Sequence, residues 1–192
     1  MHKYLLLFIS TAILSCSHPH YKDPHILIET NYGDIELALY PDKAPKTVAA
    51  FLSYIDSGYY NKTSFYRVIK TEDLAGTNYG IIQGGIWQTN DQQHPAIPGI
   101  VHETTQQTGL SHTSGTISLA RTTPGSANTE FFICVGDQVQ YDYGNNGVAD
   151  RQGFAAFGSV FSGMDIVRKI QEQPSRGERF VEKIRIDRIK RL

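Results

Sequence analysis

Cysteine, tryptophan and net charge are all scarce in this chain of 192 residues. Its two cysteines are too few for a disulfide framework or a four-cysteine zinc site. Its 18 Lys and Arg residues nearly balance 19 Asp and Glu residues, so the basic excess typical of nucleic-acid binding is missing. Its 17 glycines and 8 prolines are close to average usage, which excludes a collagen-like or low-complexity chain. The length fits one domain with a short appendage.

A long apolar run is also missing, because the run at residues 4–14 is shorter than the roughly 20 residues of a transmembrane helix. It follows Lys3 and has the dimensions of the hydrophobic region of a signal peptide. Ser15 and Cys16 come next, and the stretch resembles a bacterial lipoprotein signal, in which a small residue precedes the cysteine that is lipidated.

This resemblance predicts a signal peptide over residues 1–15, a lipid on Cys16, a flexible tether over residues 16–24 and a folded domain over residues 25–192. It places the protein in the bacterial cell envelope, on the outer membrane or the periplasmic face, with the lipid as its only membrane contact. The alternative is an ordinary secretory signal with a chance cysteine. If Cys16 is lipidated, Cys134 has no partner, and its apolar neighbours predict a buried, inert thiol.

The remaining pattern is mainly β. Alternating apolar residues and turn signals predict a hairpin over 25–40 and strands at 64–69, 80–85, 115–120, 130–135, 154–161 and 180–192. Helical periodicity covers 47–57, with Gly58 after its end, and a second helix begins at Ser162, whose spacing to Asp165 approximates a capping box. Residues 71–79 and 89–114 are predicted to be loops. An antiparallel barrel capped by two helices fits this inventory best.

Four segments carry the most specific signal, and they stand in this order: Phe65-Tyr66-Arg67-Val68-Ile69, Ile82-Gln83-Gly84-Gly85, Gly115-Thr116-Ile117-Ser118-Leu119-Ala120-Arg121 and Glu130-Phe131-Phe132-Ile133. Together they resemble the cyclophilin family of peptidyl-prolyl cis–trans isomerases over residues 25–192. The resemblance implies a closed eight-stranded antiparallel barrel with two helices. It also implies a monomer that acts on proline-containing segments of client proteins and needs no metal or other cofactor.

The chemistry of this reaction favours an arginine. Rotation about an X–Pro bond is slow because twisting the amide destroys its resonance, which gives a barrier of about 18–20 kcal/mol. In the twisted state the prolyl nitrogen becomes a hydrogen-bond acceptor, so a fixed cationic donor stabilises it. Arg67 is always charged and has a forked set of donors, and the resemblance makes it the catalytic residue.

The resemblance also implies roles for other residues. Phe132 is expected to floor a proline pocket, Gln83 to orient Arg67 or hold a peptide carbonyl, and Ala120 and Arg121 to offer backbone contacts along a groove. The full set expected to bind substrate is Phe65, Ile81, Gln83, Ala120, Arg121, Glu130, Phe132, Tyr141 and Phe154.

Several positions depart from the family pattern. Glu130 stands where glutamine is common and is expected to pair with Arg67 or Arg121. The indole that the family has after Phe132 is missing, because Trp87 is the single tryptophan and lies in another segment. Gly80 stands where a pocket phenylalanine is common, and Tyr79 is a candidate replacement.

Two other functions are considered. A barrel of this kind can recognise proline-containing segments as a binding module or chaperone with little catalysis, but Arg67 together with Phe132 and Gln83 favours activity. A serine hydrolase is suggested by the pairs Ser111-His112 and His102-Glu103. No Gly-x-Ser-x-Gly motif supports it, and adjacent residues rarely face each other usefully.

Overall fold

The structure is a computed structural model that describes residues 21–72, 74–89 and 96–192. The predicted signal peptide, Cys16 and the first residues of the predicted tether lie outside the described residues. The last tether residues lie against the folded domain, where the Tyr21 ring stacks on the His25 ring at 3.6 Å between centroids. No helix in the described ranges is long and apolar enough to cross a membrane.

Nine strands and three α-helices make up the regular structure of the described residues. The strands are β1 (His25–Thr30), β2 (Gly33–Leu39), β3 (Thr63–Glu72), β4 (Asn78–Gly85), β5 (Thr116–Leu119), β6 (Phe131–Val135), β7 (Ala155–Ser162), β8 (Ser175–Arg176) and β9 (Arg179–Arg191). The helices are α1 (Pro45–Asp56), α2 (Thr105–Thr108), α3 (Met164–Gln171) and the 3₁₀ turn η1 (Val139–Tyr141).

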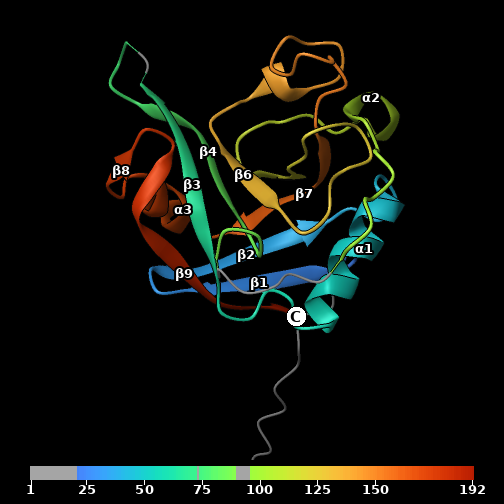
Figure 1. The fold of residues 1–192 in the computed structure, drawn as a ribbon, viewed down its shortest axis with the longest axis horizontal. Coiled ribbons are helices and arrows are strands. Elements are labelled where there is room, and N and C mark those ends of the chain that lie inside the picture. The colour runs from blue at the N-terminus through green and yellow to red at the C-terminus, as the bar shows by residue number, and fades with distance from the viewer. Residues whose placement is uncertain (1–20, 73, 90–95) are drawn as a thin grey trace, which may run out of the picture.

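Eight of these strands close into an antiparallel barrel, as predicted. Their order is β1-β2-β7-β5-β6-β4-β3-β9, and β9 pairs back with β1. The two-residue β8 adds a short hairpin to β9. Figure 1 shows the barrel with α1 and α3 on opposite sides of it. Because β1 and β9 pair through their backbones, the barrel has no open edge between its first and last strands.

The helices agree with the prediction except at their ends and in number. Helix α1 buries Val48, Phe51 and Ile55 against the barrel, and Gly58 follows its end at a φ of +73°. The predicted capping box of α3 is wrong, because Ser162 is the last residue of β7 and Gly163 precedes the helix without a side-chain cap. The one-turn helix α2 was not predicted and lies inside the predicted loop 89–114.

The hairpin of β3 and β4 is longer than predicted. Thr71 pairs with Tyr79 and Glu72 with Asn78, so only the middle of the predicted loop 71–79 is a turn. These outer residues are polar on both faces and therefore carry no apolar alternation that sequence could reveal. Figure 1 shows this ribbon extending past the barrel.

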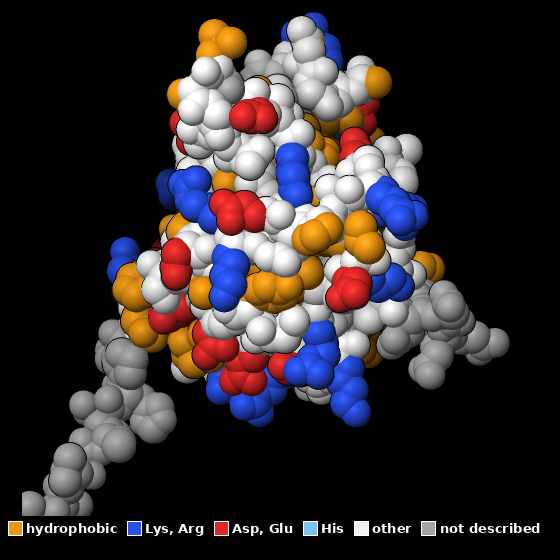
Figure 2. Space-filling view, turned by 90° about the vertical axis from the view of Figure 1, so that its left-hand side faces the viewer, with side chains coloured by type: hydrophobic (Ala, Val, Ile, Leu, Met, Phe, Trp, Pro, Cys, Tyr) orange, Lys and Arg blue, Asp and Glu red, His pale blue; other side chains and the backbone are white. Residues whose placement is uncertain are grey.

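The surface mixes charges of both signs. Figure 2 shows the side that carries β3, β8 and β9, where basic and acidic side chains are interspersed. Ion pairs among the described residues include Arg188 with Glu29 at 2.6 Å and Arg185 with Asp187 at 2.8 Å. This described face therefore has no broad area of one sign.

Strand alternation divides the apolar residues into two clusters. Phe131, Ile133 and Val135 of β6 point into the barrel and belong to its large core. Phe132 and Cys134 alternate with them and form, with Ile81 of β4, a separate cluster on the outer face. This outer cluster positions the functional site, because a side chain outside the barrel is available to a ligand.

A β-bulge in β3 disturbs this alternation. The register of β3 shifts between Phe65 and Arg67 against both β4 and β9, and Tyr66 has no partner in either pairing. Phe65 therefore points inward and is fully buried, packing edge-to-face on Phe131 with ring centroids 5.8 Å apart. The prediction that Phe65 binds substrate is wrong, because the bulge separates its face from that of Arg67.

We expect Phe65→Ala to lower the free energy of unfolding by about 3–5 kcal/mol, because it leaves a cavity among packed aromatic rings. Phe65→Leu is expected to cost less, since it keeps most of the apolar volume. Urea denaturation measures both losses, with Phe161→Ala as the control because Phe161 is exposed on β7. An equal loss for Phe65→Ala and Phe161→Ala contradicts the core assignment.

Candidate active site

A pocket of about 680 Å³ lies on the outer face of β3, β4 and β6. It contains nine of the ten predicted domain site residues, and Phe65 is the exception. Its lining residues come from three strands, from the 3₁₀ turn η1 and from the loops beside them: Tyr66, Arg67, Ile69, Ile81, Gln83, Trp87, Gln88, Ala120, Arg121, Thr122, Ser126, Asn128, Glu130, Phe132, Tyr141, Gly147 and Phe154. The fold thus brings together side chains that are up to 88 positions apart in the sequence, from Tyr66 to Phe154.

The apolar part of this pocket surrounds Phe132. The Phe132 ring is 2% exposed and lies on the outer side of β6. Tyr141 and Phe154 stand edge-on to it, with ring centroids at 5.8 and 5.2 Å. Ile81 packs in the same cluster. Such an arrangement of an aromatic floor with aromatic walls fits a small apolar ring.

Arg67 stands at the polar edge of the pocket and is held from two sides. Its Nη1 donates to Gln83 Oε1 at 2.8 Å, the orienting contact that the sequence predicts. Its Nε and Nη2 both donate to Glu178 Oε2, at 2.9 and 2.6 Å. These contacts use three of its five N–H donors and leave two without a partner among the described residues.

Glu178 itself is held by the backbone. The N–H of Val68 donates to the Glu178 carbonyl oxygen at 2.9 Å, which fixes the β8–β9 turn beside the bulge of β3. Arg179, the next residue, lies directly opposite Arg67 in the strand register. Like charges in that position repel each other, so the Glu178 carboxylate offsets the repulsion.

Glu130 does not pair with either arginine, so that prediction is wrong. Arg67 pairs with Glu178 and Arg121 with Asp150. The Glu130 carboxylate turns instead toward β4, where it accepts hydrogen bonds from Tyr66 and from the backbone N–H groups of Ile86 and Trp87. Burial raises the pKa of Glu130 above its usual value, although these hydrogen bonds act in the opposite direction.

The side chain of Arg121 also has a role in the site, in addition to the backbone contacts that the resemblance predicts. Its side chain is fully buried and donates to Asp150, at 2.7 Å, and to the carbonyl oxygen of Gly153. The Arg121 guanidinium lowers the pKa of Asp150 to about 2. It also lies over the Phe154 ring, 5.4 Å from the centroid. Arg121 therefore fixes the loop that supplies one wall of the pocket.

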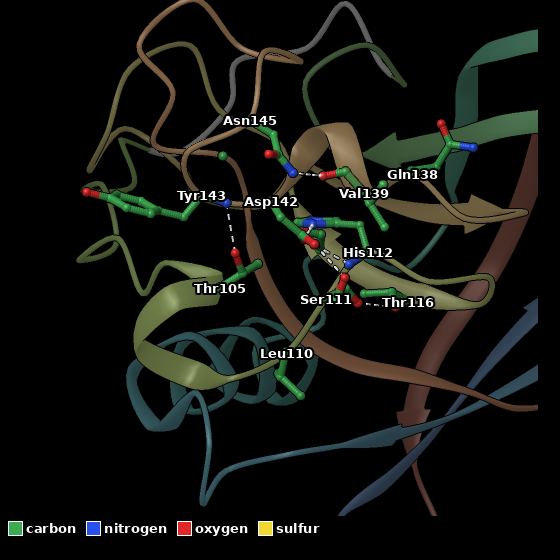
Figure 3. A network of polar contacts seen from close by, with 12 residues as sticks. Thr105, Leu110, Ser111, His112, Thr116, Gln138, Val139, Asp142, Tyr143 and Asn145 are labelled. Atoms are coloured by element: carbon green, nitrogen blue, oxygen red, sulfur yellow. Dashed lines mark hydrogen bonds and ion pairs between the residues drawn. The ribbon is translucent and has the colours of Figure 1, made fainter.

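A second polar network supports the pocket from behind (Figure 3). His112 is fully buried, with Nδ1 at 2.6 Å from Asp142 and Nε2 at 3.0 Å from Ser118. Its ring stacks behind Phe132 at 5.8 Å between centroids. Hydrogen bonds from His112 and Ser111 outweigh the effect of burial and lower the pKa of Asp142.

This network does not form a hydrolase site. Ser111 donates to Asp142 and not to its neighbour His112, and no part of the His112 side chain reaches solvent. A substrate therefore has no access to the imidazole. Because Asp142 follows Tyr141, the network anchors the loop that places Tyr141 beside Phe132.

Three site residues escaped the sequence analysis. Glu178 is 111 residues from Arg67 and has no local motif. Tyr66 lies in the same motif as Arg67, but only the bulge turns both residues to the same side. Trp87 lines the pocket from the end of β4, although it lies in another segment than the family's indole. Tyr79 does not replace the missing pocket phenylalanine, because it does not line the pocket. It lies beside Gly136, where an added Cβ would be 2.9 Å from the Tyr79 Cβ.

No group of three or more His, Cys, Asp or Glu side chains that could hold a metal ion occurs in the described part of the chain. What the site offers is an apolar cavity beside an oriented guanidinium. Residues 25–191 match the family model described as cyclophilin type peptidyl-prolyl cis-trans isomerase/CLD. The chain belongs to the cyclophilin family.

Bacterial relatives of this cyclophilin are isomerases by name. Peptidyl-prolyl cis-trans isomerase A of Dickeya dadantii is 38% identical over 149 residues, which cover 77% of this chain and 71% of that protein. Peptidyl-prolyl cis-trans isomerase B of Escherichia coli K12 is 37% identical over 147 residues, covering 76% and 83%. Together with the family match, these relatives show that the chain is a peptidyl-prolyl cis–trans isomerase.

A solved structure agrees with the fold. A cyclophilin type isomerase of Cryptosporidium parvum superposes with a TM-score of 0.69 at 23% identity, covering 88% of this chain and 97% of that one. A second crystal structure of the same protein, in the presence of the dipeptide Ala-Pro, has a TM-score of 0.67 at 24% identity and covers 86% and 96%. Both likenesses concern the fold.

We expect Glu178→Ala to lower kcat/KM about fivefold, because an exposed ion pair contributes up to about 1 kcal/mol and here it restricts the guanidinium of the catalytic candidate. Glu182→Ala is the matched control, since it removes the same charge from an exposed position on β9 outside the pocket. An isomerase assay on an X–Pro peptide compares the two. Equal activities of both variants show that Glu178 does not orient Arg67.

Proposed function

We propose that this cyclophilin isomerises X–Pro bonds in exported client proteins, with Arg67 as the catalytic residue and the Phe132 pocket as the proline site. The observation that carries the proposal is the guanidinium of Arg67, held by Gln83 and Glu178 at the rim of an aromatic pocket. The proline ring occupies the pocket formed by Phe132, Tyr141 and Phe154. The prolyl nitrogen then faces the N–H groups of Arg67 that Gln83 and Glu178 leave available.

Arg67 supplies part of the rate enhancement. A hydrogen bond to a charged group contributes about 1.5–3 kcal/mol, whereas a rate gain of about 10⁵ requires about 7 kcal/mol. The remaining part comes from fixing the peptide, because the pocket grips the ring while the groove beside Ala120 and Arg121 holds the flanking residues. Only contacts that are stronger in the twisted state than in the planar one raise kcat.

The alternative is a module that binds proline-containing segments with little catalysis. A binding module needs the aromatic pocket but gains nothing from a guanidinium fixed by two partners. The orientation of Arg67 by Gln83 and Glu178 therefore favours catalysis. Nuclear magnetic resonance exchange measurements on an X–Pro peptide separate the two functions, because a binder shifts the peptide signals without accelerating their cis–trans exchange.

We expect Arg67→Ala to lower kcat/KM by about two orders of magnitude, which corresponds to about 2.7 kcal/mol. Arg67→Lys is also expected to be poor, since a point charge cannot reproduce the planar fork. The exchange assay and a thermal melt are made on the same samples, because the change must leave the fold intact. Wild-type activity in Arg67→Ala removes Arg67 from the mechanism.

We propose further that the enzyme is a lipoprotein of the cell envelope and acts as a monomer. The support is the charged start, the short apolar run and the Ser15-Cys16 pair. A lipid on Cys16 leaves four residues before Tyr21, whose ring lies on the barrel. The attachment point is therefore close to the folded domain, and exported chains that emerge near the membrane are the clients that such an enzyme meets.

We expect Cys16→Ala to move the protein from the membrane fraction to the soluble fraction while kcat/KM stays unchanged, because Cys16 precedes the domain that carries the pocket. Mass spectrometry of the native protein reads the modification directly. A free Cys16 thiol, or a mature chain that begins elsewhere, contradicts the lipoprotein proposal and leaves the isomerase unaffected.

A further inference from the structure

Four side chains form an unbroken line of hydrogen bonds that ends at the catalytic candidate. Arg67 Nη1 donates to Gln83 Oε1 at 2.8 Å, and Gln83 Nε2 donates to the Tyr66 hydroxyl oxygen at 3.0 Å. The Tyr66 hydroxyl donates to Glu130 Oε2. Every donor in this line points away from Arg67 and toward Glu130.

The two ends of the line explain its direction. A guanidinium has only donors and an ionised carboxylate has only acceptors, whereas a glutamine amide and a phenol have both. The Tyr66 hydroxyl has one hydrogen, and the Glu130 carboxylate takes it. The Tyr66 oxygen is then left as an acceptor, and among the described residues the amide nitrogen of Gln83 donates to it. The amide oxygen of Gln83 consequently faces Arg67.

We propose that Glu130 is a positioning residue that acts on Arg67 through Tyr66 and Gln83 by setting the direction of these hydrogen bonds. This inference rests on the proposed catalytic role of Arg67. It makes Tyr66 the residue through which Glu130 sets the direction of the hydrogen bonds between Gln83 and Arg67. Glu130 does so without touching Arg67.

The position of the Glu130 carboxylate is tightly defined. Its Oε1 accepts from the backbone N–H groups of Ile86 and Trp87 at 2.8 and 3.0 Å. Gly85 has a φ of +148°, and a Cβ on this residue would lie 2.3 Å from Oε1. The second glycine of the Gln-Gly-Gly motif thus leaves room for the carboxylate. Since Oε1 serves the backbone, only Oε2 is available to Tyr66.

This division makes Glu130→Gln a disruptive change. The amide oxygen must replace Oε1 to keep the two backbone hydrogen bonds, so the amide NH₂ group faces Tyr66. The Tyr66 hydrogen then either loses its buried acceptor or turns toward Gln83. In the second case the Gln83 amide flips and presents its own donors to the donors of Arg67. Both results loosen or misdirect the guanidinium.

The burial of the line supports this argument. Gln83 and Tyr66 are 8% and 4% exposed, so water cannot readily replace a lost partner. Burial and the neighbouring carboxylate raise the pKa of Tyr66 far above its usual value, which keeps the hydroxyl protonated. The phenol therefore remains a donor to Glu130.

A double-mutant cycle tests the proposal in the full-length protein. Glu130→Gln is expected to lower kcat about five- to tenfold with KM nearly unchanged, because the loss concerns the twisted state. Tyr66→Phe removes the link and is expected to cost about threefold, since Arg67 alone still favours the amide oxygen of Gln83. The combined variant is expected to match Tyr66→Phe and therefore to be more active than Glu130→Gln alone.

Thr129→Val is the matched control. Its hydroxyl also donates to the Glu130 carboxylate, at 3.3 Å, but it lies outside the line to Arg67. We expect its kcat to stay within about twofold of the wild type. The free energy of unfolding of each variant, measured in urea, separates lost stability from lost orientation.

Two outcomes overturn the proposal: a wild-type kcat for Glu130→Gln, or losses in the combined variant that multiply as for independent residues. Arg67→Ala separates these outcomes from a failure of the proposed function. If Arg67→Ala is inactive while Glu130→Gln is normal, only the positioning role is lost. If Arg67→Ala is fully active, the catalytic role of Arg67 fails first.

Discussion

The bulge at Tyr66 is the constraint on which the site depends. In a regular strand, Tyr66 and Arg67 face opposite sides and Phe65 shares the face of Arg67. The register shift in β3 places Phe65 in the core and leaves both following residues on the outer side. Without it, the barrel could keep Arg67 in the pocket only by losing an aromatic residue from its interior. One unpaired residue therefore reconciles the packing of the barrel with the chemistry on its surface.

Much of the fold follows from patterns within a few residues. The five apolar residues of β6 predict a strand, but they do not show which side chains fill the barrel, and only the family resemblance placed Phe132 in a pocket. The helical periodicity of residues 47–57 likewise predicts α1. Bounds fail where no apolar pattern exists, as in the polar ends of β3 and β4. The predicted start of α3 at Ser162 is also wrong, because Ser162 is the last residue of β7 and pairs with Glu36 of β2.

The candidate site is predictable only where the ordered motifs mark it. Arg67, Gln83 and Phe132 stand in those motifs, and the structure brings them to one pocket. Glu178 comes from a distant hairpin, and its place beside Arg67 depends on a backbone hydrogen bond to Val68. Glu130 is predicted to pair with the wrong partner, because its place in the family motif puts a carboxylate in the same site as Arg67 and Arg121 and so suggests an ion pair. The glycine at position 85 and two backbone N–H groups draw it elsewhere.

The burial of Cys134 limits the reactivity of its thiol. Its sulfur lies in the outer apolar cluster, fully buried beside Phe132, and burial raises the pKa of the thiol far above its usual value. The reactive thiolate is therefore scarce in the native state, and thiol–disulfide exchange requires the side chains packed against this cluster, among them Tyr141, to move away. The rate at which a thiol reagent modifies Cys134 consequently reports how often Tyr141 and its neighbours move away from this cluster, without any introduced label.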